Sequence, residues 1–259
     1  MKIAVCGKGG VGKTFIAGSL ARCLVKSGHP VLAIDADSSP NLAQTLGLTN
    51  EEAVRIVPVA ENEALIRLKT GTDYSGVFRL TFTVDDIIRD YAVPTPSGAH
   101  LLVMGTVKAM GSGCACPAHS VVKALMRHLV VERDEAVILD MEAGIEHLGR
   151  GTASHVNSLV VVTDANRKSL EVAATICRIA RESDIAHVGL VGNRVDGPRH
   201  ETAIRDFAHE HGLEIIALIP YDSGVAEAGI SGNPLDETAS PAFTAIRNLA
   251  GSLAREGER

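Results

Sequence analysis

Aromatic side chains are scarce in this chain of 259 residues: tryptophan is absent, and phenylalanine and tyrosine bring the aromatic share only to 3%. Proteins that hold single-stranded nucleic acid rely on stacking its bases against aromatic rings. The formal net charge of −6 gives no overall attraction to nucleic acid or to an anionic membrane either. We therefore expect neither nucleic acid nor a membrane as a partner.

Long apolar runs are missing as well. The sequence contains no stretch of about 18 apolar residues, which a membrane-spanning helix needs, and its opening, MKIAVCGKGG, lacks the apolar run of a secretory signal. Five cysteines, an odd number, disfavour a disulfide framework. These features predict a cytoplasmic protein in a reducing environment, with Cys6, Cys23 and Cys177 as buried thiols in apolar or helical segments.

What the sequence does contain is a regular succession of short apolar runs, most of them followed by Gly, Asp or Asn. The runs with the length of a strand are 2–7, 29–35, 100–105, 135–141, 158–165, 187–193 and 214–220. Amphipathic stretches that suit helices lie between most of them, for example 13–28, 120–132, 169–184 and 200–212. This alternation predicts an α/β fold: a mostly parallel sheet of seven or eight strands with helices on both faces.

No change of composition marks a linker, so we expect a single domain over residues 1–259. The least regular part, about residues 50–100, is expected to be an insertion between two core strands. We predict a helix over 51–71, a short edge element over the alternating GVFRLTFTV at 76–84, and a second helix over 85–94. The insertion is either a functional surface or a plain structural element.

The segment GKGGVGKT at residues 7–14 lies directly between a predicted strand and a predicted helix, and it has the P-loop pattern. Glycines let backbone N–H groups turn inward around phosphate oxygens, and the helix presents its positive N-terminal end to them. Lys13 would contact the β- and γ-phosphates, and Thr14 would offer its hydroxyl to Mg²⁺. The residues expected around the phosphates are Gly9, Gly10, Val11, Gly12, Lys13 and Thr14.

Lys8 adds a second lysine near the start of this loop. The resulting KGGVGKT resembles the deviant Walker A loop of the ATPase class that includes MinD, ParA and the nitrogenase iron protein. The resemblance implies a homodimer in which Lys8 reaches across the interface to the partner's nucleotide, in the role of an arginine finger supplied in trans. We count Lys8 and Lys13 among the expected catalytic residues.

Acidic residues follow the second predicted strand, in AIDAD. Asp35 and Asp37 point to the same side because strand residues alternate. At the carboxyl edge of a parallel sheet they would face the ligand and hold the waters of Mg²⁺ or orient the attacking water. The alternative is a helix cap at Asp37 or Ser38. Related ATPases often have a proline directly after the second aspartate, whereas here it comes three residues later, as Pro40.

The run VILDMEAG resembles a Walker B strand that leads into a γ-phosphate-sensing turn. Asp140 would bind Mg²⁺ through water, and the backbone N–H of Gly144 would contact the γ-phosphate. Asp37 and Asp140 complete the set of expected catalytic residues. Glu142, Glu146 and His147 are either parts of the same switch or solvated surface groups.

The segment LVGNRVD contains the candidate contact for the base. The amide of Asn193 can donate and accept hydrogen bonds together. The string NRVD also resembles the Asn-Lys-x-Asp signature of GTPases, so Asp196 could bind guanine, and residue chemistry alone leaves ATP and GTP open. The resemblance to the dimeric ATPases favours ATP. It implies a base site that contains Asn193, Arg194, Pro220, Tyr221 and Asp222.

Residues 111–119, GSGCACPAH, hold a Cys-x-Cys pair. In an extended segment Cys114 and Cys116 point to the same side and can present two thiolates to one metal ion. A tetrahedral Zn²⁺ site needs four ligands, and thiolates suit other transition metals as well. The missing ligands can come from His119 and another residue, or from the same pair of a second subunit related by a two-fold axis.

Three features together resemble the CooC family of nickel-handling ATPases, which mature carbon monoxide dehydrogenase: the deviant P-loop, the Cys-x-Cys pair before a helix, and DMEAGIEHLGRGTA at 140–153. The resemblance runs from Met1 to about Ala242. It implies a homodimer formed around ATP and Mg²⁺, with one metal held between Cys114 and Cys116 of both subunits. It further implies that ATP turnover delivers Ni²⁺ to the dehydrogenase. The sequence leaves Ni²⁺ or Zn²⁺ open at the cysteines.

The main alternative is a positioning or partitioning ATPase of the MinD/ParA type, which binds membrane or DNA. The tail FTAIRNLAGSLAREGER has few bulky apolar residues for a membrane-binding helix, and no basic stripe for DNA is evident. Nitrogenase-type reductases separate their two cysteines widely, and iron–sulfur scaffold ATPases space theirs Cys-x-x-Cys. The spacing of Cys114 and Cys116 disfavours both classes.

Overall fold

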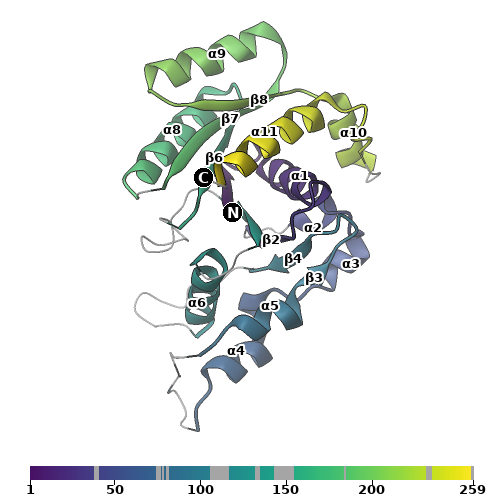
Figure 1. Cartoon of the computed structure of the whole chain (residues 1–259), viewed down its shortest axis with the longest axis vertical. Coiled ribbons are helices and arrows are strands. Elements are labelled where there is room, and N and C mark those ends of the chain that lie inside the picture. Colours follow the sequence, from purple (N-terminus) through teal and green to yellow (C-terminus); the bar gives the residue numbers. More distant parts are fainter. Residues whose placement is uncertain are drawn as a thin grey trace.

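One sheet organises the chain (Figure 1). The computed structural model describes residues 1–37, 41–73, 77, 79, 82–105, 117–131, 135–142, 155–183, 185–231 and 235–257. In these ranges the strands lie in the order β3-β4-β2-β5-β1-β6-β7-β8, and every neighbouring pair is parallel except β3 with β4. The strands are β1 (Lys2–Gly7), β2 (Val31–Ala36), β3 (Val93–Pro94), β4 (His100–Val103), β5 (Ala136–Met141), β6 (Ser158–Thr163), β7 (His187–Val195) and β8 (Ile215–Pro220).

The seven apolar runs that the sequence predicts as strands are all strands, and their ends differ from the predicted ones by no more than two residues. The eighth strand, β3, pairs antiparallel with β4 at the edge of the sheet. Its Pro94 has no N–H to donate, and an edge is where such a residue disturbs the ladder least. The predicted α/β fold with a mostly parallel sheet is confirmed.

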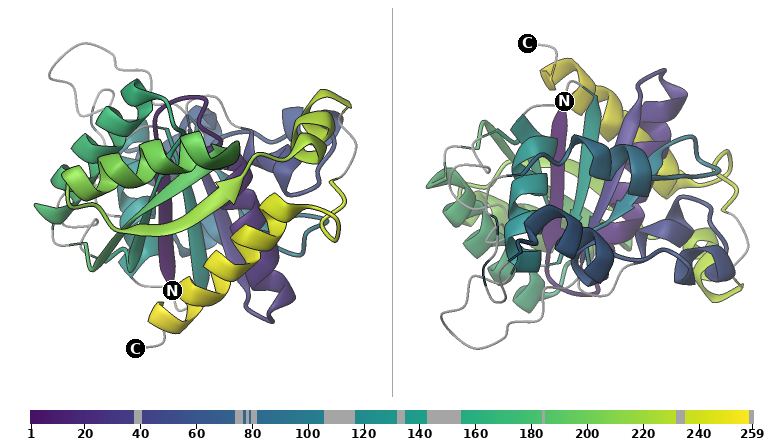
Figure 2. Two further views of the ribbon diagram at one scale, coloured as in Figure 1. Left: turned by 90° about the horizontal axis from the view of Figure 1, so that it is seen from above. Right: turned by 90° about the horizontal axis from the view of Figure 1, so that it is seen from below.

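Side chains of the strands alternate between two hydrophobic cores, one on each face of the sheet. On β5, Ala136 and Ile138 pack in the core under α1 and α11, whereas Val137 and Leu139 pack in the core on the opposite face. Burial on both faces explains why the strands read as continuous apolar runs. Figures 1 and 2 show α11 alongside α1 on one face of the sheet.

The helices before β8 lie between strands in sequence, as the amphipathic stretches predict, and α10 and α11 follow β8. None of those in the described ranges is long and apolar enough to cross a membrane. The α-helices are α1 (Lys13–Lys26), α2 (Leu42–Thr45), α3 (Asn50–Val54), α4 (Glu63–Thr70), α5 (Asp85–Tyr91), α6 (Pro117–Val131), α8 (Arg167–Arg181), α9 (Gly197–Glu210), α10 (Ser223–Ser231) and α11 (Pro241–Gly257).

The insertion at 50–100 differs from the prediction in two ways. The single helix predicted over 51–71 is divided into α3, a 3-10 turn at Val59–Glu61, and α4. Pro58 lies at the break in an extended conformation, since proline cannot continue a helix and keeps the residue before it out of helical geometry. The edge strand is at Val93–Pro94, and residues 77, 79 and 82–84 of the predicted edge element are not in a strand.

The strand order places β1 between β5 and β6, so the loop GKGGVGKT leaves the sheet near its centre. Gly7, the last residue of β1, has a φ of +143°, and a Cβ there would lie 2.2 Å from the carbonyl oxygen of Val162 on β6. That oxygen belongs to the backbone of a central strand and has no room to move. Only glycine fits this position.

We predict that Gly7→Ala lowers the free energy of unfolding by about 2–4 kcal/mol, because it combines backbone strain with a backbone clash. Gly9→Ala is the matched control. Its Cβ would meet no atom within 4 Å, so we expect a change below about 1 kcal/mol. Urea unfolding followed by circular dichroism measures both, and equal losses in the two variants would contradict the explanation.

Candidate functional site

The phosphate loop turns over the carboxyl end of β1 and leads into α1. Gly12 precedes the helix with a left-handed φ of 95°, no side chain caps the first turn, and that turn contains no acidic residue. The N–H groups at the start of α1 are therefore available to an anion. Lys13 is 5% exposed, and its Nζ lies 3.4 Å from the carbonyl oxygen of Lys8, so its side chain folds back over the loop.

Lys8 is half-buried in this loop. Its ammonium has no hydrogen-bond or ion-pair partner in the part of the chain that the structure describes. The two lysines of the loop therefore differ: Lys13 is turned into its own loop, whereas the Lys8 ammonium makes no such contact with the described residues.

The end of β7 holds the loop from the sheet side. Asn193, 4% exposed, donates from Nδ2 to the carbonyl oxygen of Val11 at 2.8 Å, and Arg194 donates from Nη1 to the carbonyl oxygen of Gly10 at 2.9 Å. Arg194 has a φ of 53°, a left-handed conformation that costs a non-glycine residue about 1 kcal/mol or more. A Cβ on Gly12 would lie 2.3 Å from Nδ2 of Asn193, so this glycine also permits the close approach.

Asp35 and Asp140 lie side by side near the carboxyl ends of two adjacent inner strands. They are register partners on the parallel strands β2 and β5, and both face the α1 side of the sheet. Both are fully buried. Asp35 accepts backbone hydrogen bonds from Leu42 at 2.9 Å and from Asp37 at 3.3 Å. Asp35 thereby fixes the chain after β2 and brings the half-buried Asp37 next to the pair.

Asp140 is the unsatisfied member of the pair. Its carboxylate oxygens accept no hydrogen bond of normal geometry from the described residues. Burial raises its pKa to about 7, and the charges of Asp35 and Asp37 add to the shift, while the Thr14 hydroxyl and the Lys13 ammonium oppose it. The unsatisfied Asp140 carboxylate and the nearby Thr14 hydroxyl together supply oxygen ligands that suit Mg²⁺.

A cavity of about 400 Å³ opens next to the loop, between the ends of β7 and β8 and the helices α10 and α11. It brings together residues predicted for the base, namely Asn193, Arg194, Pro220, Tyr221 and Asp222. Sequence reasoning missed the others, because small and apolar residues of a helix carry no signal of a ligand. They are Phe15, Val225, Ala226, Gly229 and Ala242, and Gly12 of the loop also reaches the cavity.

Asp222 fixes the wall of this cavity. Its carboxylate accepts hydrogen bonds from the Ser240 hydroxyl at 2.5 Å, from the N–H of Gly224 at 2.8 Å and from the N–H of Ala242 at 3.3 Å. Partial burial opposes ionisation, but these hydrogen bonds together keep the pKa of Asp222 below its ordinary value. The carboxylate therefore joins the starts of α10 and α11 around the cavity.

Asp196, the residue that would have to bind guanine, does not line the cavity. It is exposed and precedes α9, where its N–H contacts Nδ1 of His200 at 3.2 Å. Gly144, Cys114, Cys116, Glu146 and His147 lie outside the described residues. His119 is exposed on α6, and within the described ranges no cluster of three or more His, Cys, Asp and Glu side chains is arranged to hold a metal ion.

The raised pKa of Asp140 predicts how the stability of the metal-free protein depends on pH. Because the folded-state pKa is about 7 and the ordinary value is 3.8, the folded state holds a proton that the unfolded chain releases. Stability should therefore fall as the pH rises from about 4 to 7. Asp140→Asn should raise the melting temperature clearly at pH 8 and little at pH 5.

Calorimetry in the presence of a chelator measures this difference. Asp206→Asn, at an exposed position on α9, is the control and should change the melting temperature equally at both pH values. If Asp140→Asn stabilised the protein equally at pH 5 and pH 8, the raised pKa of Asp140 in the folded state would be refuted. Saturating Mg²⁺ should reduce the advantage of Asp140→Asn at pH 8.

Comparison with known proteins agrees with this geometry. The model of the CobQ/CobB/MinD/ParA nucleotide binding domain matches residues 2–235. The chain is 42% identical over 234 residues to the carbon monoxide dehydrogenase accessory protein CooC of Rhodospirillum rubrum, which covers 90% of this chain and 88% of that protein. It is 40% identical over 239 residues to an uncharacterized ATP-binding protein of Methanocaldococcus jannaschii, 91% of each chain.

Among solved structures, the cell division protein MinD of Aquifex aeolicus has a TM-score of 0.67 at 23% identity and covers 98% of this chain and 95% of its own. Cobyrinic acid a,c-diamide synthase of Mycobacterium smegmatis, with a bound ATP analog and magnesium, has a TM-score of 0.64 at 20% identity and covers 99% of this chain and 95% of its own. These structures share the fold. The family model and the similar sequences show that this chain belongs to the CobQ/CobB/MinD/ParA family of P-loop ATPases.

Proposed function

We propose that the protein is a homodimeric ATPase that carries Ni²⁺ between Cys114 and Cys116 of its two subunits and supports nickel insertion into carbon monoxide dehydrogenase. The observation that carries the proposal is the 42% identity, over 90% of the chain, to an accessory protein of that dehydrogenase. The MinD and ParA structures, at 20–24% identity, support the fold alone. The free thiols Cys6, Cys23 and Cys177 favour the reducing cytoplasm as its compartment.

The hydrogen bonding of the Asn193 side chain favours ATP over GTP as the nucleotide. Its Nδ2 is committed to the carbonyl oxygen of Val11, and its Oδ1 accepts no hydrogen bond from the described residues. An acceptor suits the exocyclic amine of adenine, whereas guanine carries an acceptor, O6, at the equivalent atom. Asp196, which would have to contact the guanine amines, is outside the cavity.

The residues of one subunit would bind and orient the nucleotide. The N–H groups of the loop and of the start of α1 hold the phosphates, and Lys13 neutralises their charge. Thr14 and Asp140 would hold Mg²⁺, which screens phosphate charge when bound. Asp37 would orient the attacking water, and Lys8 of the partner subunit would stabilise charge on the phosphates as the bond between the β- and γ-phosphates breaks.

The cysteine pair would connect hydrolysis to metal transfer. Cys114 and Cys116 directly precede α6, and two copies of the pair supply the four thiolates of a tetrahedral site. Such a site exists only while the two subunits stay together around ATP. Separation after hydrolysis would remove half of the ligands and release the metal ion to the dehydrogenase.

For the catalytic role of Lys8, we predict that Lys8→Ala lowers ATP turnover by at least about a hundredfold and leaves nucleotide affinity within about threefold. The reason is that the ammonium acts on the transition state from the other subunit and not on the nucleotide of its own. Phosphate release and calorimetric titration with a non-hydrolysable ATP analogue measure the two effects. Lys168→Ala, an exposed lysine of α8, is the control, and normal turnover by Lys8→Ala would refute the role.

For the metal site, we predict one Ni²⁺ per dimer when the protein is loaded with ATP and Ni²⁺, separated by gel filtration and examined by elemental analysis. The double variant Cys114→Ser/Cys116→Ser should lose the metal and keep ATP binding. Cys177→Ala, which removes a thiol buried in α8, should keep it. One metal per monomer, or retention by the double variant, would contradict the bridging site. Wild-type dimers that turn over ATP but bind no nickel would favour a positioning ATPase.

A further inference from the structure

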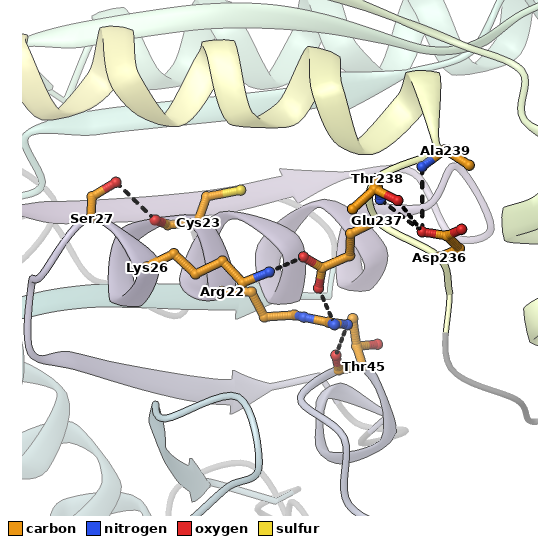
Figure 3. Close-up of polar contacts among 9 residues, drawn as sticks. All are labelled: Arg22, Cys23, Lys26, Ser27, Thr45, Asp236, Glu237, Thr238 and Ala239. Carbon is orange, nitrogen blue, oxygen red and sulfur yellow. Dashed lines mark hydrogen bonds and ion pairs between the residues drawn. The ribbon is translucent and has the colours of Figure 1, made fainter.

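A buried acid ties the turn before α11 to the helix that follows the phosphate loop. Glu237 is 8% exposed and lies between Arg22 and Lys26, which are one turn apart on α1 (Figure 3). It forms an ion pair with each of them, through Oε1 to Arg22 and through Oε2 to Lys26. Arg22 also donates to the carbonyl oxygen of Thr45, at the end of α2, at 3.4 Å.

The surroundings make Glu237 hard to replace. Arg22, Lys26 and Arg247 lie around the ring of Phe243, with their charged groups 5.5–5.8 Å from its centre. In the described ranges Glu237 is the acid that pairs with Arg22 and Lys26. Lys26 is mostly exposed, so its pair contributes little, whereas Arg22 is partly buried. Loss of the buried carboxylate would leave two neighbouring cations without their shared partner.

The turn held by Glu237 leads directly to the wall of the cavity. Beside Glu237, the carboxylate of Asp236 accepts hydrogen bonds from the N–H and the hydroxyl of Thr238, at 2.9 and 2.6 Å, which fix the bend shown in Figure 3. The chain then reaches Ser240, whose hydroxyl donates to Asp222 and accepts from the N–H of Phe243 at 3.0 Å. Asp222 and Ala242 line the cavity.

We propose that Glu237 is a positioning residue for the nucleotide base. Through Arg22 and Lys26 it fixes residues 235–240 against α1 and thereby sets the place of the cavity wall formed by Asp222 and Ala242. The phosphate loop is held by other contacts, those of Asn193 and Arg194, so Glu237 acts on the base end of the site and not on the phosphate end. This inference rests on the proposed function, in which ATP is the ligand of the cavity.

The test compares ATP with inorganic tripolyphosphate, which carries the phosphates but no base, each with Mg²⁺ and each by calorimetric titration of the full chain. Glu237→Gln keeps the size of the side chain and removes its charge. We expect it to weaken ATP binding about tenfold and to leave tripolyphosphate binding within about twofold. Glu210→Gln, an exposed acid at the end of α9, is the matched control and should change neither.

Two further variants keep the test decisive. Arg22→Gln should weaken ATP binding as much as Glu237→Gln, and the double variant should lose no more than either single one. Lys26→Gln removes only the exposed partner and should leave both affinities within about twofold. Arg22→Gln therefore supplies the selective loss of ATP binding if Glu237→Gln does not fold.

The outcomes separate the two proposals. Equal weakening of ATP and tripolyphosphate by Glu237→Gln would show a general structural role and overturn the inference, as would unchanged ATP binding. In both cases a wild-type chain that binds ATP leaves the proposed function standing. A wild-type chain that binds tripolyphosphate but gains nothing from the base of ATP would overturn the ATP assignment together with this inference.

Discussion

The parallel pairing of β5 with its two neighbours is the constraint on which the site depends. The register places Asp140 opposite Asp35 on one side and Val5 of β1 on the other, two residues before the phosphate loop begins. Backbone ladders on both sides fix these positions, so neither carboxylate can move away from the other. The sheet thus holds two buried acids next to a loop that carries Lys13.

Two buried carboxylates side by side are unfavourable because burial removes their hydration and their charges repel each other. The two residues are stabilised in different ways. Asp35 uses its oxygens for backbone N–H groups after β2, as buried carboxylates usually do. Asp140 has no such donors in the described ranges, and burial raises its pKa to about 7. A divalent cation beside Thr14 would stabilise the charged form and remove the penalty. The structure therefore combines one acid that shapes the chain with one that is left for a ligand.

The sequence predicts the phosphate half of the site well because its signals are local. Each signal occupies only a few consecutive residues: an apolar run of strand length, a glycine pattern, or an aspartate at the end of a strand. The break at Pro58 was also readable from the sequence, since proline limits any helix, and the prediction of one helix over 51–71 gave too much weight to the amphipathic pattern.

The base half could not be predicted to the same extent, because it is assembled from distant segments. In the sequence LDETAS, Glu237 has the surroundings of a solvent-exposed acid. It is buried only because residues 235–240 pack against α1. Its contact with Lys26 joins residues that are 211 positions apart in the sequence. The apolar lining from α10 and α11 likewise has the composition of ordinary helix surface. When burial arises from tertiary packing alone, the sequence shows no periodic hydrophobic pattern at such positions.

Asn193 joins the two halves, and the geometry of the peptide bond explains how. In a planar trans peptide, the carbonyl of one residue and the N–H of the next point in opposite directions. Arg194 holds the carbonyl of Gly10 toward β7, and Asn193 holds that of Val11. The N–H groups of Val11 and Gly12 must then point away from β7, into the loop where an anion would bind. The same Asn193 lines the cavity, so one side chain both orients the donors for the phosphates and contributes to the wall around the base.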